Sequence, residues 1–220
     1  MKTIAIIGTG QGFGYSVAKT FGKQGYNVAM ISRSKIKLET FSYYLQQAGI
    51  NAKGFEGSML DRTSLKRSLE QAEEHFGAID VLEYSPVMNL TKPLDVLEMD
   101  ERSFGEAVDH MLSGAITAVN HVLPAMLEMR QGTLIFTSGL SATTTVPQMD
   151  HCLIATAALS KYAELLHAEL KGRGVHSALF SLEWSKTGSP YEPDAAAEHL
   201  YNTVFLEREN AVEPYLCNGF

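Results

Sequence analysis

The chain has 220 residues, of which 45% are hydrophobic and 20% are charged, an ordinary balance for one soluble domain with a sizeable core. Its net charge of -7, without a basic cluster, argues against a nucleic-acid-binding surface. Two cysteines, Cys152 and Cys217, are too few for a disulfide framework or a zinc site, so a cytoplasmic location is expected. Because no leader precedes the first strand and no apolar run could cross a bilayer, we expect no membrane association.

The opening stretch T-I-A-I-I-G-T-G-Q-G-F-G, residues 3–14, predicts a strand, a glycine turn and a helix. In this order, backbone N–H groups and a helix N-terminus can face a pyrophosphate. Gly8 permits the sharp turn, Gly12 lets a phosphate approach the backbone, and Gly14 lets the helix pack against the strand. The alternative is a tight turn without a ligand, but the strand–turn–helix context favours nucleotide binding.

Strand and helix patterns alternate along the rest of the chain. Further strands are expected at 27–34, 51–56, 79–84, 133–137, 175–182 and 211–216, and helices at 14–24, 35–48, 61–76, 100–130, 152–171 and 194–208. Asp61 and Asp100 are suitable N-caps for two of these helices. The alternation predicts an α/β fold with a doubly wound parallel sheet, and without a linker or repeat we expect residues 1–220 to form a single domain.

Short motifs recur in the order and spacing of one large enzyme family. They are the glycines at 8, 12 and 14, I-D-V-L at 79–82, Gly114 followed by Leu123 and Pro124, A-A-L at 157–159 and A-E-L at 168–170. In these features the chain resembles the short-chain dehydrogenase/reductase (SDR) superfamily over nearly its whole length. The resemblance implies a Rossmann-type domain that binds a nicotinamide cofactor.

The resemblance places the cofactor contacts on the glycine loop and on the ends of neighbouring strands. The expected residues are Gly8, Gly10, Gln11, Gly12, Phe13, Gly14, Ser32, Arg33, Ser58, Met59, Ser85 and Pro86. Where the family carries a carboxylate for the ribose 2′-hydroxyl of NAD, this chain has Ser32 and Arg33. A hydroxyl followed by a guanidinium suits a 2′-phosphate, so NADP(H) is expected rather than NAD(H), the alternative being a solvated arginine.

The catalytic tetrad of the family has no counterpart by residue type. The alignment puts Met111, Gly139, Cys152 and Thr156 where the family has asparagine, serine, tyrosine and lysine. A threonine carries no charge, and a thiol without a neighbouring cation stays protonated and is a weak proton donor. The sixth strand is expected to end at Phe180 and Ser181, in place of the family's Pro-Gly beside the nicotinamide.

Two other side chains are candidates for an acid–base role. His151 lies beside the tyrosine position, and Ser138 ends the fifth strand. For His151 the alternative is a solvent-exposed histidine at a helix start. Tyr15 and Lys19 match the Tyr-x-x-x-Lys pattern by letter, but they lie in the first helix, far from the expected substrate position.

Two functional classes therefore stay open. One is an oxidoreductase that uses NADPH on an unknown small-molecule substrate through a rebuilt site. The other is a non-catalytic NADP(H)-binding sensor or partner subunit. No metal site is indicated, and the resemblance implies a homodimer or homotetramer formed through the helices near 101–130 and 152–171.

Overall fold

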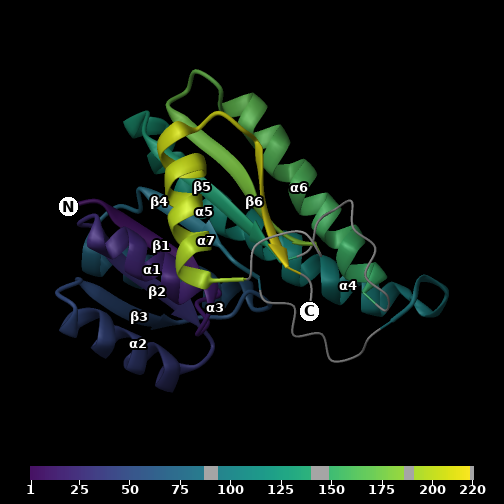
Figure 1. The fold of residues 1–220 in the computed structure, drawn as a ribbon, viewed down its shortest axis with the longest axis horizontal. Helices are drawn as coiled ribbons and strands as arrows, with labels where there is room; N and C mark the ends of the chain where they lie inside the picture. Colours follow the sequence, from purple (N-terminus) through teal and green to yellow (C-terminus); the bar gives the residue numbers. More distant parts are fainter. Residues whose placement is uncertain (87–93, 140–148, 186–190, 219–220) are drawn as a thin grey trace.

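The computed structural model describes residues 1–86, 94–139, 149–185 and 191–218. Within them, parallel strands form one seven-stranded sheet in the order β3-β2-β1-β4-β5-β6-β7 (Figure 1). The strands are β1 (Thr3–Ile7), β2 (Asn27–Ser32), β3 (Ala52–Glu56), β4 (Val81–Tyr84), β5 (Gly132–Ser138), β6 (Val175–Ser185) and β7 (Val212–Asn218). The expected doubly wound α/β fold is confirmed. The order in which successive strands are added to the sheet reverses beside β1, which is where such sheets form their ligand crevice.

Helices cover both faces of this sheet (Figure 1). One face is covered by α1 (Phe13–Lys23), α2 (Lys35–Gln47) and α7 (Pro193–His199), and the other by α3 (Arg62–Phe76), α5 (Gly114–Met129) and α6 (Asp150–Leu170). Side chains of β1 alternate between the two cores, with Ile4 and Ile6 on the α1 face and Ala5 and Ile7 on the α5 face. Burial on both sides explains why the central strands are nearly continuous apolar runs. No helix in the described ranges is long and apolar enough to span a membrane.

Both expected N-caps are confirmed. The Asp61 carboxylate accepts hydrogen bonds from the backbone N–H groups of Thr63 and Ser64, each at 3.0 Å, at the start of α3. Asp100 accepts from the Ser103 N–H at 2.8 Å, while the Asp100 N–H donates to the Ser103 hydroxyl at 3.1 Å. This reciprocal pair starts α4 (Glu101–Val108) by satisfying N–H groups that have no partner within the helix.

The prediction of one continuous helix over 100–130 is wrong. A π-helical segment, η2 (Asp109–Ser113), separates α4 from α5. The buried Tyr84 hydroxyl donates to the His110 carbonyl oxygen at 2.6 Å, and a Cβ at Gly114 would lie 2.3 Å from that hydroxyl. The wider turn fits the helix around Tyr84, a contact that the helical pattern does not reveal. The last helix is also divided, because α7 is followed by a π-helical segment, η3 (Leu200–Glu207).

Three other element boundaries differ from the expected ones. β6 runs on to Ser185, because it pairs with β7 as far as that residue, so Phe180 and Ser181 lie inside the strand and the Pro-Gly comparison is misplaced. α6 begins at Asp150, which puts His151 and Cys152 in its first turn. β4 begins at Val81, two residues after the expected start at Ile79.

Candidate cofactor site

The glycine loop joins β1 to α1 at the centre of the sheet. Gly8 has φ +95°, and a Cβ there would lie 2.1 Å from the Ser85 carbonyl oxygen, so the turn requires glycine. A Cβ at Gly14 would lie 3.1 Å from the Thr9 Cα, which shows how closely α1 approaches the loop. A Cβ at Gly12 would meet nothing within 4 Å, so the loop backbone is open to a ligand there.

A cavity of about 640 Å³ opens beside this loop, at the carboxyl ends of β1, β2 and β3. Seven of the expected cofactor residues line it: Gly8, Gly10, Gln11, Ser32, Arg33, Ser58 and Met59. Its remaining lining residues are Ile7, Thr9, Ile31, Ser34, Lys37, Gly57, Leu60 and His110. The glycine loop, the end of β2 and the segment after β3 therefore converge on one space, as a dinucleotide site requires.

The other five expected residues do not line this cavity. Gly12 and Gly14 lie at the start of α1, and Ser85 and Pro86 are buried beyond the end of β4. Phe13 is only 8% exposed and stacks on Phe180, with ring centroids 5.6 Å apart and planes at 8°. The Phe13 side chain thus belongs to the core on the α1 face.

Two cations stand at the start of α2. Arg33 and Lys37 are exposed and line the cavity, and no carboxylate in the described ranges pairs with either. The Ser34 hydroxyl caps α2 by accepting from the Lys37 N–H at 3.4 Å. The helix N-terminus and both cations favour an anion here. Lys37 was missed in the sequence, although its place in the first helical turn after Arg33 was a readable signal.

The opposite wall of the cavity is held in place by Arg62. Its guanidinium donates to the carbonyl oxygens of Met59 and Leu60, at 3.1 and 3.2 Å, and pairs with Asp109 of η2. These contacts tie the segment after β3 to the π-helical segment that carries His110. Arg62 therefore connects the two segments that form this side of the cavity.

Glu83 is a second residue that the sequence analysis missed. It is fully buried in β4, where the Thr137 hydroxyl donates to its Oε1 at 2.7 Å. Its Oε2 has no hydrogen-bond partner in the described part of the chain. Burial raises the pKa of this carboxyl to about 8, against the opposing effect of hydrogen bonds from Thr137 and Ser85. The visible signal was a carboxylate within the apolar run I-D-V-L-E-Y.

Three of the four positions that correspond to the catalytic tetrad are buried. Met111 is 1% exposed, and Cys152 and Thr156 are fully buried. Burial raises the pKa of the Cys152 thiol to about 11, and the Thr156 hydroxyl has no partner in the described ranges. His151 is only 3% exposed, so a solvated histidine is the wrong interpretation, and its Nδ1 has no hydrogen-bond partner in the structure as described.

The remaining candidates lie at the end of β5. Ser138 is buried and pairs in register with Ser181, while Gly139 is exposed. Since α6 packs against both β5 and η2, the tetrad positions do come together in one region. The described residues contain no cluster of three or more side chains that could bind a metal.

The Tyr-x-x-x-Lys match in α1 has other partners. Tyr15 packs on Phe41, with ring centroids 5.0 Å apart. Lys19 forms an ion pair with Asp194 at the start of α7, and Asp194 also accepts from the Ser16 hydroxyl at 2.6 Å. Both side chains therefore serve packing on the α1 face.

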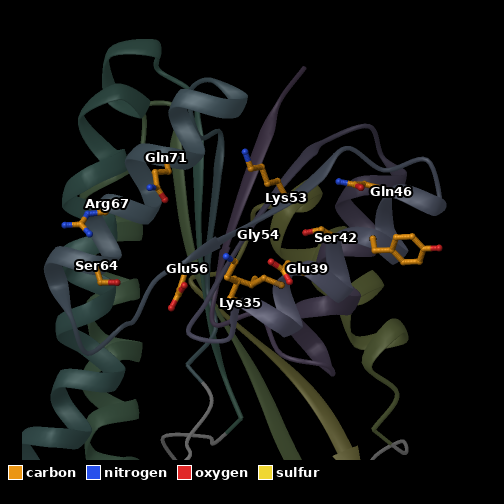
Figure 2. Close-up of a pocket in the computed structure, with 12 residues that line it drawn as sticks. Lys35, Glu39, Ser42, Gln46, Lys53, Gly54, Glu56, Ser64, Arg67 and Gln71 are labelled. Atoms are coloured by element: carbon orange, nitrogen blue, oxygen red, sulfur yellow. The ribbon is translucent and has the colours of Figure 1, made fainter.

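A separate groove of about 760 Å³ runs along the edge strand β3, between α2 and α3 (Figure 2). It is lined largely by polar and charged side chains, among them Lys35, Glu39, Lys53, Glu56 and Arg67. It shares no lining residue with the cavity beside the glycine loop. The Gln46 side chain donates to the Ala52 carbonyl oxygen at 2.8 Å, covering part of the strand edge.

The family of the chain follows from comparison with known sequences. The profile of the short chain dehydrogenase family matches residues 2–187. The chain belongs to this family. A 3-oxoacyl-(acyl-carrier-protein) reductase FabG of Staphylococcus aureus is 24% identical over 175 residues, which cover 79% of this chain and 70% of that relative. A short chain dehydrogenase of Pseudocercospora fijiensis is 27% identical over 209 residues, or 90% of this chain and 65% of the relative.

Solved SDR structures share the fold over almost the whole chain. A metagenomic short-chain oxidoreductase in complex with NADP superposes with a TM-score of 0.84 at 17% identity, covering 100% of this chain and 97% of the other. An actinorhodin polyketide ketoreductase with NADPH superposes with a TM-score of 0.87 at 17% identity, covering 99% of this chain and 96% of the other. These matches establish the fold, and both proteins were solved with the phosphorylated cofactor.

Proposed function

We propose that this SDR-family protein binds NADP(H) and acts as an oxidoreductase on a small-molecule substrate through an altered catalytic site. The observation that carries the proposal is the pair Arg33 and Lys37 beside the glycine loop, with no described carboxylate to neutralise them. A carboxylate at the end of β2 would repel a 2′-phosphate, whereas two cations attract it. The NADP and NADPH bound in the two related structures agree with this preference.

The cavity and the adjoining start of α1 would each have a role in binding the cofactor. The open backbone at Gly12 and the N-terminus of α1 would face the pyrophosphate, and Arg33 with Lys37 would hold the 2′-phosphate. Ser58 and Met59, on the wall held by Arg62, would face the base. Bound NADPH supplies a hydride, while the protein must still supply a proton where the alkoxide develops.

The proton donor is the weak point of an ordinary SDR reaction here. Burial raises the pKa of the Cys152 thiol to about 11, so this thiol stays protonated near neutral pH, and Thr156 offers no cation. Their burial favours a second candidate function, a non-catalytic NADP(H)-binding sensor or partner subunit. His151 directly precedes Cys152 in the first turn of α6, so it is the residue to test if turnover is found.

Cofactor titration tests the proposal. NADPH should bind more tightly than NADH, and Arg33→Ala should weaken NADPH by about 1–3 kcal/mol while leaving NADH nearly unchanged, because one charge-assisted contact is lost. Arg67→Ala is a matched control, since Arg67 is exposed in the groove along β3 and does not line the cofactor cavity. Equal affinities of the parent protein for the two cofactors would contradict the NADP(H) preference.

A redox screen with NADPH separates the two candidate functions. A 3-oxoacyl thioester, the class named for the FabG relatives, is the first substrate to try. Turnover supports the altered oxidoreductase, and His151→Ala should then lower kcat with cofactor binding intact. Cofactor binding without turnover of any substrate supports the sensor or partner subunit. A cytosolic location is part of the proposal and rests on the two cysteines alone.

A further inference from the structure

Glu83 lies inside the sheet, next to the glycine loop. Its strand β4 runs between β1 and β5, and Glu83 itself is paired with Ile6 and Ile135. Its neighbours Leu82 and Tyr84 belong to the core on the α5 face, so the Glu83 side chain points to the α1 face. Two residues on, the Ser85 N–H donates to the carbonyl oxygen of Ile7 at 2.8 Å, at the point where the loop begins.

The surroundings of the Glu83 carboxyl connect it to the start of α1. Thr137, which donates to the carboxyl, is paired in register with Phe180. Phe180 stacks on Phe13, the first residue of α1. The carboxyl therefore lies on the face of the sheet that the N-terminus of α1 covers, and the pyrophosphate of the proposed cofactor would lie at that same N-terminus.

No described cation neutralises Glu83. Among the charged groups on the elements of this face, Lys19 pairs with Asp194, His199 pairs with Glu213, and the Arg208 guanidinium donates to the Phe205 carbonyl oxygen. Lys23 of α1 and Lys35 and Lys37 of α2 are exposed, and no ion pair with the buried Glu83 is formed by any of them. Hydrogen bonds with Lys19 and Ser16 hold the pKa of Asp194 below its usual value. His176 lies near the start of β6, and burial lowers its pKa to about 4. An ionised Glu83 would thus be an unpaired buried anion.

We propose that Glu83 is a positioning residue that couples NADP(H) binding to the uptake of one proton. With the carboxyl neutral, the N-terminus of α1 is available to the pyrophosphate. With the carboxyl ionised, a buried anion on the same face of the sheet repels the pyrophosphate at that helix end. The proton comes from solvent and no bond to the cofactor forms. This inference rests on the proposed NADP(H) binding.

The test compares the parent protein with Glu83→Gln, which keeps the shape of the side chain but replaces the titrating carboxyl with a neutral amide. NADPH affinity is measured by cofactor fluorescence between about pH 6.5 and 9.5. The 2′-phosphate of the cofactor also titrates, with a pKa of about 6. The two proteins are therefore compared by the difference between their changes in NADPH affinity with pH. As the pH rises through this range, the NADPH affinity of the parent should fall by about tenfold more than that of Glu83→Gln. This is the change expected when cofactor binding raises the pKa of the Glu83 carboxyl by about one unit.

A second readout follows the proton directly. Calorimetry near pH 8 in two buffers of different ionisation enthalpy should show proton uptake on NADPH binding by the parent, and none by Glu83→Gln beyond that of the cofactor. Thr137→Val keeps the carboxyl but removes a hydrogen bond that lowers its pKa, so uptake should persist and move to higher pH. Identical pH profiles of parent and Glu83→Gln, with NADPH binding intact, would overturn this inference alone. Absence of NADPH binding at every pH would overturn the proposed function and the inference with it.

Discussion

Replacing Glu83 with glutamine should remove a pH-dependent loss of stability from the cofactor-free protein. In the unfolded chain the carboxyl ionises near its ordinary pKa of 4.5, whereas burial in β4 raises the pKa to about 8 in the folded state. Between these values the folded protein holds a proton that the unfolded chain has released. The stability contributed by this carboxyl is therefore highest below pH 4.5 and is lost as the pH rises to about 8.

The size of the effect follows from the same two values. At about 1.4 kcal/mol per pH unit, the full interval corresponds to roughly 5 kcal/mol. About 2–3 kcal/mol of this loss should fall between pH 5 and pH 7, which is a large part of the stability of an ordinary domain. Glu83→Gln should not show this loss, because its side chain stays neutral at every pH.

Urea unfolding followed by circular dichroism at pH 5, 7 and 8.5 measures the effect, with the protein concentration held fixed. The parent and variant should differ most at pH 8.5, and their free energies of unfolding should converge toward pH 5. Thr137→Val is a useful comparison, because it removes the hydrogen bond at 2.7 Å and leaves the titrating group in place. Parallel pH profiles for the parent and Glu83→Gln would refute the reasoning, since the carboxyl would then ionise alike in both states.

Two further predictions concern the helices near the proposed site. Light scattering at micromolar concentration should show a homodimer or homotetramer, because α6 presents an exposed apolar stripe that includes Ile154 and Leu165, at 43% and 62% exposure. A monomer would rule out this interface. Cys152→Tyr combined with Thr156→Lys should lower the free energy of unfolding by at least about 1–3 kcal/mol, because both native side chains are fully buried. An unchanged thermal denaturation midpoint would show instead that the site has room for the family's tyrosine and lysine.

Local patterns in the sequence determined much of the fold. The glycine loop, the alternation of strands and helices and the caps Asp61 and Asp100 depend on residues within a few positions of one another, and the structure contains all of them. The motif spacing also indicated the family correctly. Within the proposed cofactor site, Arg33 could be singled out because it directly follows a recognisable strand. These features could be predicted because they are determined by interactions between residues that are close in the sequence.

Tertiary contacts decided the rest. The break between α4 and α5 comes from the hydrogen bond of Tyr84 with His110, 26 residues away in sequence. Glu83 became a buried, raised-pKa carboxyl only because β4 occupies the middle of the sheet and Thr137, 54 residues on, reaches it. His151 is buried for a similar reason, since it lies in the first turn of a helix that packs on β5 and η2. Burial and partner identity depend on which elements become neighbours, and a local pattern of residues does not contain that information.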